Sequence, residues 1–220
     1  MRFLVAVLLG LLLLAPAARA ASPTYKISAY GVQRTTTTST ATETGRCFDE
    51  RGSQSTEVVV HFKTPRALRA RVLTIGPTAT LIPAERRDLK LAGTLERKVS
   101  GAMERASCAD LNPDGSPKWV PKPLADSCSR TFDDYTASIS FTGRGLEFNA
   151  QQPLLAPLDC VNEDITTVRK RVSARQLLES DGAPIRLQTS SSSTTAAPDG
   201  SSTSTTKRLT TVYVEIRRNG

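Results

Sequence analysis

One six-residue stretch, Asp-Leu-Asn-Pro-Asp-Gly, has the opening of a calcium-binding loop, with side-chain oxygens at Asp110, Asn112 and Asp114. Alternate residues of such a loop turn their oxygens onto the cation, and glycine permits the sharp bend. The pattern then breaks, because Lys118 and Pro121 stand where the remaining ligands belong. The same residue types are ordinary turn formers. We therefore expect a plain turn and no cofactor, with calcium as the alternative.

The only tryptophan, Trp119, stands among prolines in the same stretch. An exposed tryptophan on a stiff loop is a typical anchor for a sugar ring or a partner protein. Tryptophan is also usually buried to a large extent. Two interpretations follow: Trp119 binds a ligand, or it folds back as a lid over the core, which is the one we favour.

Catalytic chemistry has few candidates. The single histidine, His61, alternates with Val60 and Phe62, so we expect it on the face opposite to theirs. No G-x-S-x-G motif supplies a nucleophile, and a lone histidine excludes a multi-histidine metal site. The acidic pairs are Asp49-Glu50, Asp133-Asp134 and Glu163-Asp164. A glycoside hydrolase requires two carboxylates across a cleft. We expect no catalytic residues and no enzyme, with a hydrolase as the lesser alternative.

The first twenty residues have the form of a signal peptide. Arg2 precedes an apolar run from Phe3 to Leu14, and Ala18-Arg19-Ala20 has the small–x–small pattern of a cleavage site. The run is short for a bilayer span, and no second long apolar run follows it. We predict cleavage after Ala20, a secreted or extracytoplasmic location, and a mature chain without a membrane span.

The formal charge of the 220-residue chain is +8, and removing Arg2 and Arg19 with the signal leaves +6. This charge supports solubility and attraction to anionic polymers of the cell surface. Nucleic-acid binding would require basic residues interleaved with stacking aromatics, and aromatics are 5% of the chain. We expect a cell-surface polymer or another protein as partner and no nucleic acid, while the oligomeric state stays open.

Four cysteines in an exported chain predict two disulfides. Three pairings are available. We favour Cys108–Cys128, which would close the proline-rich stretch around Trp119, together with Cys47–Cys160. No two cysteines have the close spacing of a zinc knuckle.

Strand signals dominate the chain after residue 23. β-Branched or alternating runs predict strands over residues 24–44, 57–63, 68–75, 89–99, 135–142 and 146–150. Arg97 interrupts an apolar register, so we expect its strand to end near a sheet edge. Residues 49–52 offer a turn between strands.

The last part of the chain predicts a hairpin and one helix. Pro198-Asp199-Gly200 is a strong turn signal, and folding about it places Ile185 and Leu187 opposite Val212 and Val214. Ser173 to Gln176 has the form of a capping box, which predicts about two helical turns near 174–180. Residues 102–106 are compatible with one further turn. The pattern favours a single all-β domain over 21–220, an antiparallel β-sandwich with long hairpins and a disulfide-closed loop over 108–128.

The layout of the chain combines several features: the signal peptide, the Thr-rich first strand, a cysteine ahead of EVVVHFKTPRALRARV, the Cys108 to Cys128 segment, Asp159-Cys160, the SARQLLE helix and the Ser/Thr-rich final hairpin. In this layout the chain resembles uncharacterised exported β-rich proteins of soil bacteria. The resemblance spans most of the mature chain and implies only fold and location. We expect a non-enzymatic β-sandwich, secreted or at the cell envelope, that is a structural or binding module. The alternative is a carbohydrate- or protein-binding module that uses Trp119, with or without calcium.

Overall fold

The computed structural model describes residues 24–44, 48–75, 78–83, 89–142, 145–151, 160 and 163–219. Most of them lie in strands, in the order β1 (Thr24–Thr44), β2 (Phe48–Lys63), β3 (Leu68–Ile75), β4 (Thr78–Pro83), β5 (Leu89–Leu111), β6 (Pro117–Thr142), β7 (Gly145–Gln151), β8 (Val168–Arg171), β9 (Ile185–Ala196) and β10 (Ser202–Arg218). A helix, α2 (Ala174–Glu179), precedes β9. The prediction of an all-β antiparallel fold is confirmed.

The ten strands form one hydrogen-bonded sheet. One edge of β1 pairs with β10 along most of its length, and the other edge pairs first with β3 and then with β2. β5 and β6 continue from β2, and β4 reaches β6 through the pair Thr80 and Thr142. The sheet is therefore nearly closed into a barrel at this end. The expected sandwich of two separate sheets is not confirmed.

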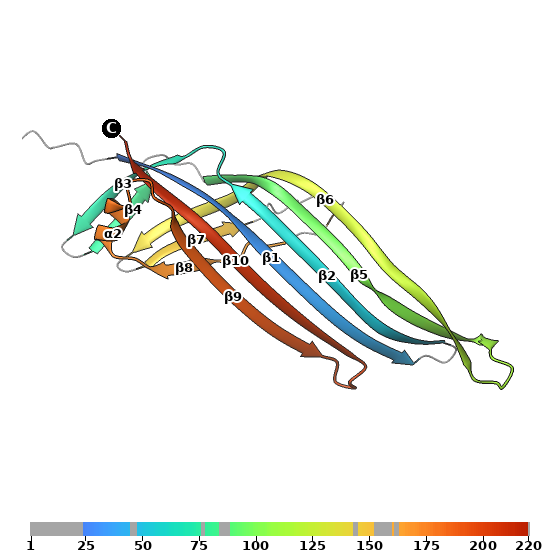
Figure 1. Cartoon of the computed structure of the whole chain (residues 1–220). Helices are drawn as coiled ribbons and strands as arrows, with labels where there is room; N and C mark the ends of the chain where they lie inside the picture. The colour runs from blue at the N-terminus through green and yellow to red at the C-terminus, as the bar shows by residue number, and fades with distance from the viewer. Residues whose placement is uncertain are drawn as a thin grey trace, which may run out of the picture.

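The hydrophobic core lies at the curled end, where α2, β3, β4, β7 and β8 gather (Figure 1). Alternate residues of β1 point into it, namely Tyr25, Ile27 and Ala29. The matching face of β10 supplies Val212, Val214 and Ile216, so the centre of the sheet is apolar on this side. We call this side of the sheet the core face.

Six strands continue beyond the core as a single layer, which we call the blade: residues 36–42, 51–56, 99–111, 117–127, 190–196 and 202–207. Figure 1 shows these strands sweeping side by side toward the hairpin tips. Among the described side chains of the blade, Ala106 is the only one that is buried. At about 3.3 Å per residue, the β5 part alone extends about 40 Å.

Several local predictions for β2 and β5 are wrong. Residues 49–52 lie inside β2 rather than in a turn, and residues 102–106 are strand rather than helix. Arg97 lies in the middle of β5, between β2 and β6, and not near an edge. The reason is the long ladder between β2 and β5, which runs without a break from Phe48 to Lys63 and overrides weak local propensities.

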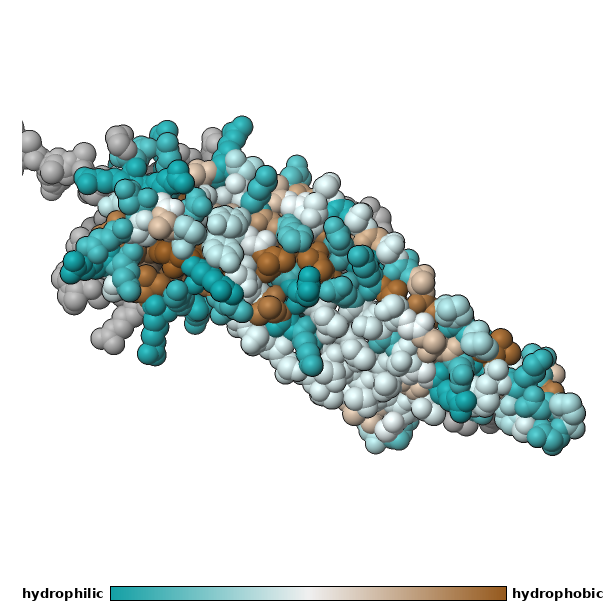
Figure 2. All heavy atoms as spheres, viewed as in Figure 1, coloured by the Kyte–Doolittle hydropathy of each residue, from teal (hydrophilic) through white to brown (hydrophobic). Residues whose placement is uncertain are grey.

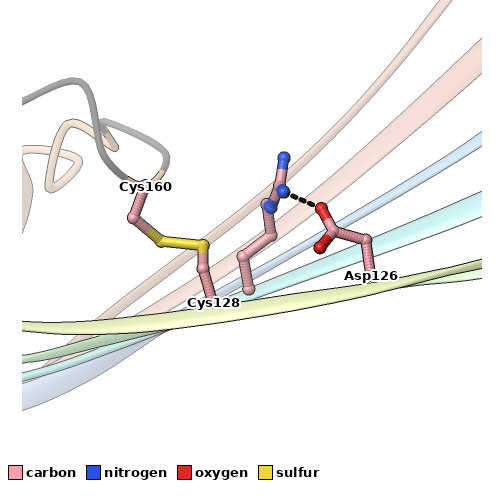
Figure 3. Close-up of a disulfide and its surroundings, with 4 residues drawn as sticks. Asp126, Cys128 and Cys160 are labelled. Carbon is pink, nitrogen blue, oxygen red and sulfur yellow. Dashed lines mark hydrogen bonds and ion pairs between the residues drawn. A yellow bond between two sulfur atoms is a disulfide. The ribbon is translucent and has the colours of Figure 1, made fainter.

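The predicted cysteine pairing is wrong. Cys128 is bonded to Cys160 (Figure 3), which excludes both Cys108–Cys128 and Cys47–Cys160 and leaves no disulfide-closed loop over 108–128. That segment is a hairpin, because β5 runs to Leu111 and β6 begins at Pro117. Its register places Arg97, and not Cys108, opposite Cys128. Cys108 is itself disulfide-bonded, and Cys47 lies outside the described residues.

The hairpin and the helix predicted near the end of the chain are confirmed. Val212 lies opposite Leu187 and Val214 opposite Ile185, as the turn at 198–200 predicts. In the capping box, Ser173 Oγ accepts from the Gln176 N–H at 3.1 Å, and Gln176 Oε1 accepts from the Ser173 N–H at 3.0 Å. Of the helical structure in the described part of the chain, none is long and apolar enough to cross a membrane. The signal peptide predicted over 1–20 lies outside the described residues.

Candidate functional site

Residues 163–167, which we call the strap, have no regular secondary structure and cross the core face of β1 and β10. Ile165 packs into the core from the strap. The strap lies where the core-face residues of β1 change from apolar to polar, between Ala29 and the buried pair Gln33 and Thr35. A cluster of polar side chains under the strap is the most enclosed polar site of the described residues.

Gln33 holds the strap through both ends of its amide. Its side chain is fully buried, and Nε2 donates to the Asp164 carbonyl at 2.7 Å and to Glu163 Oε1 at 3.2 Å. Gln33 Oε1 accepts from the Thr166 N–H and from Thr210 Oγ1, both at 2.8 Å. An amide has two donor hydrogens and two acceptor lone pairs. All four are used here, which removes the penalty of burying the group.

Glu163 brings a carboxylate under the strap, and its side chain is only 11% exposed. Glu163 Oε1 accepts from Thr35 Oγ1 at 2.7 Å and from Arg208 Nη2 at 2.8 Å. Arg208 also donates from Nε to Thr35 Oγ1 at 3.2 Å and from Nη1 to Thr166 Oγ1 at 3.4 Å. The buried charge is thus paired and hydrogen-bonded, which is the condition for tolerating it.

The other side of the strap is tied to β6. The Tyr135 hydroxyl donates to the Glu163 carbonyl at 3.1 Å, and Cys160, just before the strap, is bonded to Cys128. Burial raises the pKa of Tyr135, with the positive charge of Arg130 opposing the shift. Figure 3 shows Asp126 on the same side of β6 as Cys128, and Asp126 forms an ion pair with Arg97. The strap therefore links β1 and β10 to β6 across the mouth of the curled sheet.

The acidic pairs do not share one environment. Asp164 is exposed although its neighbour Glu163 is covered, and Asp133 and Asp134 are both exposed. Glu50 pairs with Arg105 at 3.3 Å. His61 is exposed on the face opposite to Val60 and Phe62, as predicted. What the polar cluster does chemically is hold the strap in place.

The calcium-like motif forms the turn between β5 and β6. Asp114 Oδ1 accepts from the Ser116 N–H at 3.0 Å and from Ser116 Oγ at 2.6 Å, and these bonds lower the pKa of Asp114. Asn112 Nδ2 donates to Ser116 Oγ at 2.9 Å. Asp110 is exposed at the end of β5. Within the described residues, no group of three or more histidine, cysteine or acidic side chains is placed to hold a metal ion.

Trp119 lies on the blade, away from the core, so it is not the lid that we favoured from the sequence. It is half-buried opposite Ala106, on the face of the sheet opposite to the core face. The guanidinium carbon of Arg51 lies 4.1 Å from the ring centroid, and Arg51 Nε donates to Glu104 at 2.8 Å. One face of the ring is therefore covered by a cation. Ligand binding by Trp119 stays a prediction.

The face opposite to the core face is hollowed at the base of the blade. A polar groove of about 890 Å³ crosses β1, β2, β5 and β6, and its charged lining residues include Glu57 and Lys98. A smaller hollow of about 360 Å³ lies at the tip of the β5–β6 hairpin, between Lys118, Lys122 and Val120.

Sequence reasoning missed the cluster of Gln33, Thr35, Glu163 and Arg208. A signal existed in the register of β1, because Gln33 and Thr35 occupy the same alternate positions as the apolar residues before them. A buried polar pair in that register requires partners from a segment that crosses the sheet.

No protein-family model matches the chain, and no curated protein matches it. Among solved structures, the type III secretion injectisome secretin InvG of Salmonella aligns with 98% of this chain and 66% of its own at 10% identity and a TM-score of 0.28. The Klebsiella pneumoniae type II secretion outer membrane complex of PulD, PulS and PulC aligns with 97% of this chain and 43% of its own at 6% identity and a TM-score of 0.23. The type II secretin GspD of E. coli K12 aligns with 97% of this chain and 53% of its own at 7% identity and a TM-score of 0.19. The chain thus spans less than two thirds of each, and scores this low support no functional comparison.

Proposed function

We propose that the protein is an exported, non-enzymatic β module that acts by contact, with the blade as its contact surface. The observation that carries this proposal is the absence of core burial along the described part of the blade, apart from Ala106. Burial of apolar surface is the main driving force of folding. A single layer gains little from it, so stability does not explain the length of these strands.

The chemistry of the blade favours a polar or anionic partner. Figure 2 shows the pale colours of weakly polar residues spread along β1, β9 and β10, where serine and threonine dominate. At the tip, Leu111 and Val120 are about half exposed, at 51% and 48%. Lys118 and Lys122 stand beside Val120 in the tip hollow, which Asp110 also lines, and the basic lining residues outnumber the acidic one. Cations beside exposed apolar groups suit an anionic cell-surface polymer or an acidic protein surface.

The location rests on the predicted signal peptide together with the cysteines. The Cys128–Cys160 bond and the bonded state of Cys108 are consistent with an oxidising compartment. In the proposed role the strap cluster is structural: it keeps the curled end closed and so gives the blade a rigid base.

The experiment is a co-sedimentation assay. The mature, oxidised protein is mixed with isolated bacterial cell walls at low ionic strength, and the bound fraction is measured. The tip variant Lys118→Ser/Lys122→Ser should bind several-fold less than the wild type. The matched control Lys63→Ser/Lys170→Ser removes the same charge from exposed residues outside the blade and should bind like the wild type.

Equal losses of binding in the two variants would show that net charge alone attracts the protein to the cell wall. That result would refute the role of the blade as the contact surface. No sedimentation of the wild type would remove the polymer as partner.

A further inference from the structure

The blade has two lateral edges, formed by β6 on one side and β9 on the other. The order across it is β9, β10, β1, β2, β5 and β6. In the described residues, β9 pairs only with β10, and the blade part of β6 pairs only with β5. An unpaired edge is a template for another strand, and proteins usually block it with proline, charge or a bulge.

The β6 edge is blocked. Pro117, Pro121 and Pro123 all lie in the ladder with β5, opposite Leu111, Glu104 and Ala102. Proline has no N–H to donate, so within a sheet it occupies positions whose nitrogen faces away from the ladder. These three positions therefore lack the outward donors that an added strand would need. Lys118 and Lys122 add charge to the same edge.

In the part of the chain that the structure describes, the β9 edge carries none of these blocks. From Leu187 to Ala196 it contains no proline and no charged residue. The Ala197 N–H donates to the Ser202 carbonyl at 2.9 Å, and the register with β10 continues unbroken from Ala196 back to Ile185. In an antiparallel ladder, every second residue directs its N–H and C=O groups to the same neighbouring strand. Since Ala197 bonds to β10, the odd-numbered residues of β9 direct theirs to β10 as well. The even-numbered residues direct theirs outward, and these are Gln188, Ser190, Ser192, Thr194 and Ala196.

We propose that β9 pairs in antiparallel fashion with β9 of a second copy of this chain, on a two-fold axis at Ser192. This places Ser192 opposite its counterpart, Ser190 opposite Thr194 and Gln188 opposite Ala196. Each of these pairs exchanges two main-chain hydrogen bonds, and no like charges meet.

The side chains of the sheet support a second copy as the occupant. Neighbouring Ser/Thr strands already pair by hydroxyl contacts, with 3.1 Å between the Oγ atoms of Thr194 and Thr205 and also between those of Ser39 and Ser204. A strand added beside β9 would therefore extend the Ser/Thr-rich series of β1, β10 and β9 if it is itself uncharged, rich in serine and threonine, and open at one edge. The β9 strand of a second copy meets these conditions from Leu187 to Ala196.

The asymmetry of the edges also fixes the size of the assembly. A two-fold pairing uses the open edge of both protomers, and the prolines of β6 prevent growth at the far sides. Such an assembly closes as a dimer and does not extend into a fibre.

Cysteine cross-linking tests the register. In the oxidised full-length mature chain, Ser192→Cys should form an intermolecular disulfide without added linker, because hydrogen-bonded pairs have Cα atoms about 5.5 Å apart. Ser190→Cys is the matched control. Its counterpart would lie four residues away along the strand, about 13 Å, so it should remain unlinked.

A second pair of variants tests the edge without new thiols. Ser192→Pro removes an outward N–H and leaves the ladder with β10 intact, so the mass by light scattering should fall from dimer to monomer with an unchanged circular dichroism spectrum. Ser192→Ala keeps the N–H and should remain dimeric.

A wild type that is monomeric at millimolar concentration, or a link in Ser190→Cys and not in Ser192→Cys, would overturn the proposal. The wall-binding assay changes residues at the opposite edge of the blade, so failure of one idea is distinguishable from failure of the other.

Discussion

Replacing Glu163 with alanine should destabilise the protein by about 2–3 kcal/mol. The change removes one acceptor from Gln33, Thr35 and Arg208 together. Breaking a fully buried ion pair typically costs about 3–5 kcal/mol, since the remaining charge is left unpaired. The Arg208 side chain is 33% exposed, so water partly compensates and the lower figure applies. For a chain of this size, that loss lowers Tm by about 4–12 °C.

The assay is urea unfolding of the oxidised protein followed by far-ultraviolet circular dichroism, with Tm measured in parallel. A double-mutant cycle with Arg208→Met should give a coupling energy of about 1–2 kcal/mol, because the two residues share the contact. The control is Glu179→Ala, which removes an exposed pair with Arg175 on the helix surface and should cost under about 0.5 kcal/mol. If Glu163→Ala matches that control, or if the cycle is additive, the strap is not held by this ion pair.

Four further outcomes follow from the structure. Peptide mapping without reduction should recover Cys128–Cys160, and it should link Cys108 to Cys47, since Phe48 and Ser107 are opposite each other; a Cys108–Cys128 peptide would contradict the fold. Burial raises the pKa of Tyr135, so its stabilising contribution is complete below pH about 10 and is lost as the pH rises through the folded-state pKa. Tyr135→Phe should therefore lose about 1 kcal/mol at neutral pH and decline less steeply in alkali, and an unchanged alkaline slope would refute this. Arg51→Ala should uncover the only tryptophan, giving a red-shifted emission and stronger acrylamide quenching at a cost of under about 1 kcal/mol; unaltered emission would show that the ring is not covered. Millimolar calcium should leave Tm unchanged, because the Asp114 carboxylate is engaged by Ser116, whereas a rise in Tm that Asp114→Ala abolishes would establish the calcium site.

The parts of the fold that the sequence predicts correctly are those formed by interactions between residues close together in the chain. The capping box at Ser173 and Gln176 and the turn at Pro198-Asp199-Gly200 are signals of this kind. Once the turn is fixed, the register of Leu187 against Val212 follows from alternation alone.

The curled sheet could not be predicted in this way, because it depends on which distant strands meet. β1 changes partner from β3 to β2 partway along one edge, and no local pattern in residues 24–44 marks that change. The disulfide error has the same origin. Cys128 is bonded to Cys160, which is 32 residues away in the sequence, whereas sequence spacing favours the nearer Cys108.

Sequence reasoning missed the polar cluster under the strap for a different reason. Gln33 and Thr35 begin a long polar tract, so composition places them with the exposed threonines that follow. Their burial is decided by the strap, which is distant in the chain by about the length of a small domain.

The pairing of β1 with β10 has a consequence for the order in which the chain acquires its structure. Tyr25 lies opposite Arg218 and Ala41 opposite Ser202, so the first described strand and the last one are adjacent over most of their length. A chain threaded through an export channel from its N-terminus delivers β1 first and β10 last. In the proposed export, the centre of the sheet therefore has to wait for the end of translocation, and contacts of such wide separation form slowly. During that interval β1 presents an unsatisfied edge to other chains.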